Sequence, residues 1–102
     1  MESEPSRPLG PFLGLVLGLH QAGMVALGKL VNPVSGKTEA DLDAARGTID
    51  TLAALADRTR GNLESDEARA LQQALTALRI NYLEERKRAG SAAEPAPGAE
   101  QR

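Results

Sequence analysis

Three stretches of the chain carry hydrophobic residues at the spacing of an α-helix, with polar linkers between them. The first stretch, residues 11–31, is hydrophobic around most of its circumference, which is typical of a helix buried on several sides. The second and third stretches, residues 39–60 and 65–88, each carry one hydrophobic stripe opposite a charged face. We therefore predict an all-α fold, a small protein of three helices.

The hydrophobic stripes of the second and third stretches repeat at intervals of three and four residues. Residues at this spacing share one face of a helix, so each stripe is the expected core-facing side. The rows are Leu42, Ala45, Ile49, Leu52 and Ala56 in the second stretch, and Ala68, Leu71, Leu75, Leu78 and Tyr82 in the third. Because aromatic residues make up only 2% of the chain, the predicted core is aliphatic.

Local signals mark where the three helices begin and end. The first should stop at Asn32, because the proline that follows disfavours helical geometry in the residue before it. Thr38 is the expected N-cap of the second helix, with Asp41 three residues on in a variant of the capping box. Gly61 suits the left-handed position that closes this helix, and Ser65 is the expected N-cap of the third.

The length and the terminal sequences predict one domain, residues 9–89. A chain of 102 residues rarely divides its core in two. Residues 1–8 and 90–102 are rich in small, polar and proline residues without periodicity, so we predict that both segments are disordered. The acidic start lacks the basic beginning of a secretory signal, and we expect no export signal.

The composition argues against several classes of function. The chain has no cysteine, which rules out disulfides, Cys-ligated zinc, iron–sulfur clusters and a thiol nucleophile, and is compatible with the cytoplasm. The net charge of −2 provides no field that would recruit nucleic acid or an anionic membrane without a local basic cluster. His20, Gln21 and Lys29 interrupt the first hydrophobic stretch, which argues against a transmembrane helix.

Gly36, Lys37 and Thr38 match the end of the phosphate-binding loop of nucleotide hydrolases. The full motif requires a glycine five residues before Gly36, where this chain has Val31. Such a loop also follows a buried strand, whereas a helix is expected here, and Glu39 would place negative charge against the phosphate. We therefore predict no nucleotide site in this segment.

The remaining polar residues do not suggest a catalytic or metal site. His20 is the single histidine, and its helical neighbours offer it no polar partner, so we interpret it as packed in a helix interface. A pH effect on assembly through His20 stays open. Most carboxylates stand at helix starts, where the helix dipole explains them. Arg79 and Tyr82 form a polar–aromatic pair, and a recognition role for Arg79 stays open. We predict no cofactor, no metal and no enzymatic activity.

One ordered set of residues runs through all three predicted helices. It comprises Leu27-Gly28, Pro33, Gly36-Lys37, Ile49-Asp50 with Leu52 and Leu55, Thr59 with Gly61-Asn62-Leu63, and Leu78-Arg79 with Tyr82. From about Phe12 to Glu85 this order resembles a family of small bacterial proteins, domain of unknown function 1844. The resemblance implies a cytoplasmic helical protein without an assigned activity or catalytic residues, encoded near translation genes in some bacteria.

A row of small residues runs along one side of the first predicted helix and would let the backbone of a partner approach closely. The row is Gly10, Gly14, Gly18, Ala22 and Ala26. Each glycine costs about 0.5–1 kcal/mol relative to alanine, which favours a packing role, although drift in an Ala- and Gly-rich chain would also produce the row. Gly14 and Gly18 depart from the serine and small polar residues that the resemblance leads us to expect, so the packing partner of the row stays open.

The first helix carries more hydrophobic surface than the stripes of the other two can cover. Each exposed Leu or Val would forgo about 1.5–3 kcal/mol, so we expect a second copy of the chain or a partner protein to cover the remainder. We predict a homodimer that serves as an interaction or scaffold module. The expected interface residues are Leu13, Gly14, Leu17, Gly18, Leu19 and Ala22.

Two other functions stay open. A ribosome- or RNA-associated factor would agree with the gene neighbourhood that the resemblance implies and with the basic run Arg86, Lys87 and Arg88. A peripheral membrane protein would use the first helix as an interfacial anchor.

Overall fold

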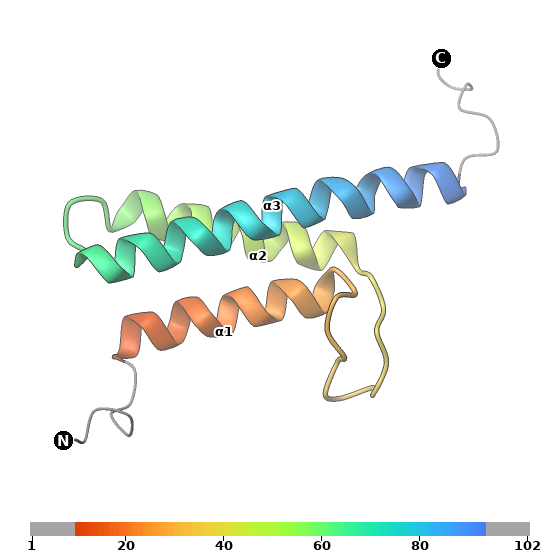
Figure 1. Cartoon of the computed structure of the whole chain (residues 1–102), viewed down its shortest axis with the longest axis horizontal. Coiled ribbons are helices and arrows are strands. Elements are labelled where there is room, and N and C mark those ends of the chain that lie inside the picture. Colours follow the sequence, from red (N-terminus) through yellow and green to blue (C-terminus); the bar gives the residue numbers. More distant parts are fainter. Residues whose placement is uncertain (1–9, 94–102) are drawn as a thin grey trace, which may run out of the picture.

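The computed structural model of the chain describes residues 10–93 and shows three helices in a bundle (Figure 1). The helices are α1, Pro11–Ala26, α2, Leu42–Arg58, and α3, Ser65–Ala93. Extended pairing within residues 10–93 is limited to an isolated bridge between Leu27 and Ala40. The predicted all-α fold of three helices is confirmed.

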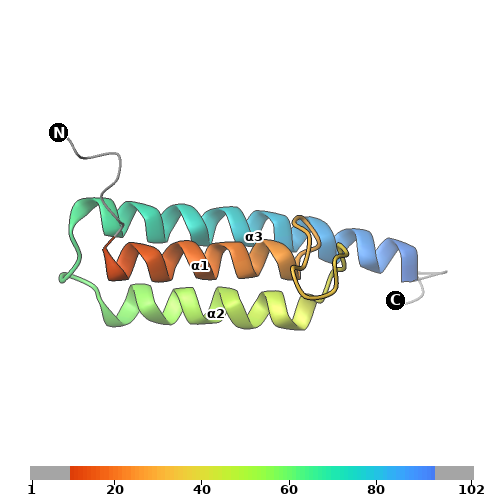
Figure 2. The same cartoon turned by 90° about the horizontal axis from the view of Figure 1, so that it is seen from below.

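The three helices run up, down and up, so that α1 and α3 are parallel and α2 is antiparallel to both (Figure 1). Each helix packs against the other two. Figure 2 shows α1 lying over the seam between α2 and α3. One side of α1 therefore points into the bundle, and its opposite side points away from the other helices.

The core lies where the three helices meet, and it is aliphatic, as predicted. Most of the buried residues of α2 and α3 belong to the rows read from the sequence. The buried hydrophobic residues are Val16, Leu27, Ala45, Ile49, Leu52, Leu71, Ala74, Leu75 and Leu78. Of the remaining row members, Tyr82, Leu42 and Ala56 are half-buried against this core, whereas Ala68 is exposed.

α1 ends at Ala26, earlier than the predicted end at Val31. The reason is Gly28, which adopts the left-handed conformation with φ of 78°. Its N–H and that of Lys29 donate to carbonyl groups of the last turn, both at 2.9 Å, in the Schellman pattern that closes a helix. Gly28 therefore stops the helix before the chain reaches Pro33, which sequence reasoning took as the stop signal.

α2 begins at Leu42, later than the predicted start at residue 39, and its N-cap is Asp41 rather than Thr38. Asp41 Oδ1 accepts a hydrogen bond from the Ala44 N–H at 3.1 Å, which satisfies one of the free donors at the helix start. The chain cannot enter the helix at Thr38, because Ala40 is still held in the bridge to the end of α1.

In the turn between α2 and α3, the observed helix ends lie closer to the positions predicted from the sequence. α2 ends at Arg58, and Gly61 takes the predicted left-handed conformation, with φ of 83°. α3 begins at Ser65, which is its first helical residue and not its cap. The Glu64 N–H before it donates to Glu67 Oε1 at 2.8 Å, which is half of a capping box.

α3 runs to Ala93, beyond the predicted end at residue 88. Residues 90–93, which the sequence assigned to a disordered tail, thus belong to the helix, consistent with the high helix propensity of the alanines among them. The predicted disordered residues 1–8 and the rest of the predicted tail lie outside the described residues.

Candidate functional site

The outward side of α1 is uncharged and mostly non-polar, and Gln21 is the one exposed polar residue of this helix. Val16 and Gly23 are the buried residues of α1, and the helix contains no charged residue. Leu15 and Leu17 are 47% and 46% exposed. The helical repeat of about 3.6 residues per turn places Gly14 and Gly18 nearly opposite Val16, with Leu15 and Leu17 on the two flanks of this small-residue row. We call the exposed residues Gly14, Leu15, Leu17, Gly18 and Ala22 the outer face of α1.

The structure separates the six predicted interface residues into two groups. Gly14, Leu17, Gly18 and Ala22 are exposed on the outer face. The other two point elsewhere: Leu19 packs against the core, and Leu13 is half-buried beside α3. A Cβ atom added at Gly14 or Gly18 would meet no atom within 4 Å, so the described chain makes no close contact with this glycine pair.

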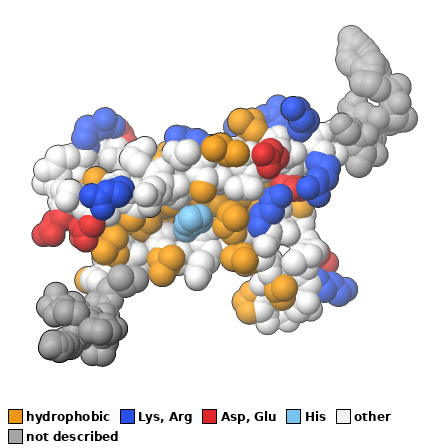
Figure 3. Space-filling view, in the orientation of Figure 1, with side chains coloured by type: hydrophobic (Ala, Val, Ile, Leu, Met, Phe, Trp, Pro, Cys, Tyr) orange, Lys and Arg blue, Asp and Glu red, His pale blue; other side chains and the backbone are white. Residues whose placement is uncertain are grey.

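A groove of about 250 Å³ borders the outer face, between α1 and α3. Its lining combines Leu13, Val16, Leu17 and His20 from α1 with Ala70 and Gln73 from α3. His20 is half-buried there and lines the groove at the edge of the contact between α1 and α3, at the molecular surface. Figure 3 shows hydrophobic side chains on either side of the histidine, so the groove continues the hydrophobic surface of α1.

The segment that follows α1, residues 27–41, projects from the bundle on the side of α1 that faces away from α2 and α3 (Figure 1). The Asp41 N–H donates to the Ala26 carbonyl at 2.6 Å, which closes the base of the segment. At its tip the Asn32 N–H donates to the Lys37 carbonyl, and Asn32 Oδ1 accepts from the Val34 N–H, both at 2.8 Å. These bonds join the two sides of the segment at its base and at its tip.

Hydrophobic side chains are exposed on this projecting segment. Val34 is 94% exposed at the tip, and Leu30 and Val31 are exposed closer to α1. Figure 3 shows hydrophobic atoms on this lobe as well as on α1. The segment therefore extends the hydrophobic surface of α1 beyond its C-terminal end. The sequence pattern does not predict this extension, because Leu30 and Val31 fall within the stretch expected to be helical.

The Gly36-Lys37-Thr38 tripeptide also lies in this segment, and all three residues are exposed. It follows a helix, and the start of α2 is occupied by the Asp41 carboxylate. In a phosphate-binding loop a strand comes first, and the helix N-terminus is free to bind phosphate. The geometry of this segment thus differs from that motif.

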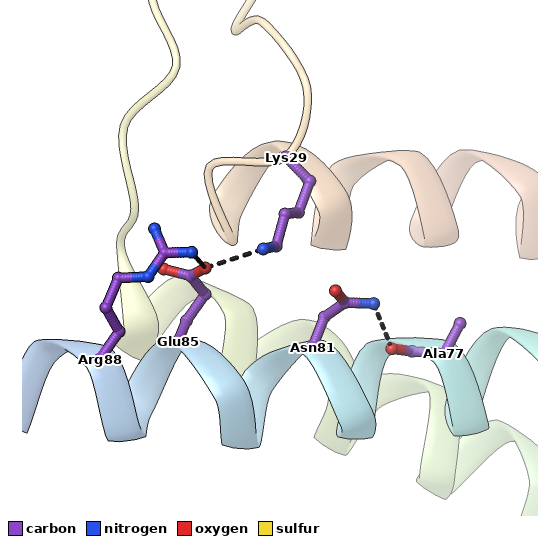
Figure 4. Close-up of polar contacts among 5 residues, drawn as sticks. All are labelled: Lys29, Ala77, Asn81, Glu85 and Arg88. Carbon is purple, nitrogen blue, oxygen red and sulfur yellow. Dashed lines mark hydrogen bonds and ion pairs between the residues drawn. The ribbon is translucent and has the colours of Figure 1, made fainter.

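An ion cluster ties the end of α1 to α3 (Figure 4). Lys29 Nζ lies 2.8 Å from Glu85 Oε2, and an Arg88 Nη atom lies 3.3 Å from the same oxygen. Glu85 is only 8% exposed. The hydrogen bond from Lys29 lowers the pKa of Glu85 and, with the positive charges of Arg88 and Lys29, outweighs the opposing effect of burial.

This cluster borders a hollow of about 880 Å³ between the projecting segment, the start of α2 and the end of α3. Its acidic lining residues are Glu39, Asp41, Asp43 and Glu85. Asp41 caps α2 and Glu85 is paired with Lys29, so two of the four carboxylates have a structural role. Within residues 10–93, no three or more His, Cys, Asp or Glu side chains are grouped so that they could hold a metal ion.

None of the three described helices combines the length and the hydrophobicity needed to cross a membrane. In comparisons with known proteins, residues 11–84 match the model of a family described as a domain of unknown function, DUF1844. No curated protein and no solved structure matches the chain. The matched residues include all of α1 and α2 and most of α3.

Proposed function

The chain belongs to the DUF1844 family, and from that premise and the geometry of α1 we propose that it is a non-enzymatic, cytoplasmic interaction module that forms a homodimer through the outer face of α1. The observation that supports this proposal most is the exposure of Leu15 and Leu17 beside a row of small residues. Burial of two half-exposed leucines in each protomer would contribute roughly 1 kcal/mol per side chain to the free energy of dimer formation.

A second copy of the chain suits this surface for two reasons. The two-fold axis of a homodimer brings a surface against its own copy, and α1 has no charged side chain that would repel its counterpart. The small residues Gly14, Gly18 and Ala22 form an i±4 row, and such rows pack into each other with the helices crossing at about −50°.

The projecting segment would enlarge this contact. It stands beyond the C-terminal end of α1 and on the same side as the outer face (Figure 1). In a two-fold pair whose α1 helices cross in opposite directions, each segment would lie near the N-terminal part of the partner's α1. Burial of Val31 and Val34 there would supply hydrophobic area that the row of small residues lacks.

The test is the mass of the full chain in solution, measured by sedimentation equilibrium over a range of concentrations. We expect a dimer that becomes a folded monomer, or aggregates, when Gly18→Leu blocks the close approach of the two helices. Gly47→Leu is the matched control, because Gly47 is also an exposed helical glycine with no atom within 4 Å, but lies on α2. A monomeric parent chain, or equal effects of the two variants, would contradict the proposal.

A peripheral membrane protein is the competing use of the same surface. Helices that lie in a membrane interface usually carry Lys or Arg on their polar side, and α1 carries none. The dimer therefore fits α1 better. Flotation with anionic vesicles separates the two functions: we expect the protein to stay with the aqueous fraction, and its recovery with the vesicles would favour the membrane function.

A further inference from the structure

A second groove lies between α2 and α3 and shares no residue with the outer face of α1. Its volume is about 330 Å³. Three arginines line it, Arg46 from α2 and Arg79 and Arg86 from α3, together with one acidic residue, Asp50. The groove is thus positively charged on a chain whose net charge is −2.

The arginines of this groove are available to a ligand. Arg46, Arg79 and Arg86 are all exposed. Within residues 10–93, the ion pairs are Lys29–Glu85, Arg60–Asp57 and Arg88–Glu85, and none of them involves a groove arginine. Arg88, the last member of the basic run at the end of α3, is committed to Glu85 and does not belong to the groove.

Hydrophobic side chains accompany the three arginines. Leu83 lines the groove and is 59% exposed, and Ile80, three residues before it on α3, is 53% exposed. Residues three apart on a helix are neighbours, so the two aliphatic side chains form one small patch beside Arg79. Ile49 of α2 is buried at the groove floor.

We infer that the groove between α2 and α3 binds an acidic, leucine-bearing helical segment of a protein partner. Arginine pairs with carboxylates through two parallel hydrogen bonds, and the aliphatic patch would be covered by leucines of the same segment. Arg79 and Arg86 are seven residues apart, which is roughly 10 Å along the helix at 1.5 Å per residue. An amphipathic helix with carboxylates two turns apart matches this spacing.

RNA would also be attracted by the arginines, but it fits the groove less well. Binding of single-stranded RNA relies on many phosphate contacts and on aromatic side chains that stack with bases. Tyr82 is the one aromatic residue of the groove and is half-buried, whereas the most exposed non-polar groups are aliphatic. Contact with phosphates would remove little of the hydrophobic surface of Leu83 and Ile80 from water, whereas contact with leucine side chains would bury it.

Fluorescence anisotropy with a labelled synthetic peptide tests this inference. The probe is an amphipathic helix of about 14 residues with leucine on one side and glutamate flanking it, and its counterpart has glutamine in place of glutamate. We expect the glutamate peptide to bind more tightly than its counterpart and to weaken at high salt. The double variant Arg79→Gln and Arg86→Gln should weaken binding about tenfold or more, and Leu83→Ser should weaken it too.

The matched control is the double variant Arg58→Gln and Arg69→Gln, which removes the same charge at exposed positions of α2 and α3 outside the groove. Circular dichroism should show that all variants are folded. The inference is overturned if the glutamate peptide does not bind, if the control variant weakens it equally, or if an RNA oligonucleotide binds more tightly with the same dependence on Arg79 and Arg86. Binding should persist in Gly18→Leu, because the groove and the outer face of α1 are separate.

Discussion

Gly23 of α1 lies so close to Leu78 of α3 that a Cβ atom built at position 23 would stand 2.7 Å from Leu78 Cδ2. Both residues are buried, and Leu78 is among the most completely buried side chains of the bundle. α1 can approach α3 this closely because position 23 has no side chain. The glycine that the bundle requires is therefore on the inner side of α1, and not in the exposed row that contains Gly14 and Gly18.

Substitution of Gly23 by alanine should destabilise the protein. Alanine is the better helix former, but Leu78 is packed at the centre of the bundle and has little room to move, so we expect a net loss of about 1–3 kcal/mol. Gly47→Ala is the control, because Gly47 is exposed on α2 with open space around it, and it should gain about 0.5–1 kcal/mol. Urea unfolding followed by circular dichroism measures both. Equal stabilisation by the two alanines would show that the Gly23 contact is not required.

The pairing of Lys29 with Glu85 predicts a dependence of stability on pH. The pKa of Glu85 lies below its ordinary value of 4.5, so the folded state favours the charged carboxylate more than the unfolded state does. Glu85 therefore contributes stability above pH 4.5, and this contribution is lost as the pH falls through the lowered pKa.

Glu85→Gln should accordingly be less stable than the parent chain at neutral pH, and the difference between the two should shrink as the solution is acidified below pH 4.5. Urea unfolding at a series of pH values measures this difference. Glu84→Gln is the matched control at the exposed neighbouring position, and it should not reproduce the effect. A stability difference for Glu85→Gln that does not vary with pH would argue against the ion pair as its cause.

The assignment of the α2 cap can be tested by two alanine substitutions. Asp41→Ala removes the side chain that accepts the Ala44 N–H, and we expect a loss of about 0.5–2 kcal/mol. Thr38→Ala should change stability by less than about 0.5 kcal/mol, because Thr38 is exposed and stands outside the helix. Thermal unfolding of the two variants gives the comparison. A larger loss of stability for Thr38→Ala than for Asp41→Ala would show that Thr38 is the N-cap, as expected from the sequence.

The closure of α1 by Gly28 predicts a difference between two glycines. Gly28 and Gly36 both have positive φ, 78° and 74°, and alanine in this conformation costs about 1–2 kcal/mol. A Cβ at Gly28 would in addition lie 3.3 Å from the Ala40 nitrogen, whereas one at Gly36 would meet no atom within 4 Å. Gly28→Ala should therefore lose more stability than Gly36→Ala in chemical unfolding. The reverse order would mean that the contact with Ala40 relaxes freely.

Much of the fold could be read from local patterns. The rows that include Ile49 and Leu52 in α2 and Leu71 and Leu75 in α3 predicted buried residues correctly, because a helix with one hydrophobic stripe can face the core in only one orientation. Helix ends were predicted less well. Gly28 and Pro33 are both stop signals, and the first of them along the chain ended the helix.

The candidate site could be predicted only in part. The composition of α1 predicts that part of its hydrophobic surface is left uncovered by the other helices. Leu17 and Gly18 are exposed. Leu19 was assigned to the same surface and instead packs against the core. A helix that is hydrophobic all round has no stripe that sets its rotation, so its own residues cannot show which side faces inward.

The sequence by itself determined the three helices, the aliphatic core and the excess of hydrophobic surface on α1, because each depends on spacing or composition within a short stretch. The tertiary structure alone decided the rotation of α1, through the contact of Gly23 with Leu78, and the anchoring of its end, through the bond between Lys29 and Glu85. The second pair is 56 residues apart in the chain. Contacts at such separation depend on how whole helices pack, and no local pattern encodes that geometry.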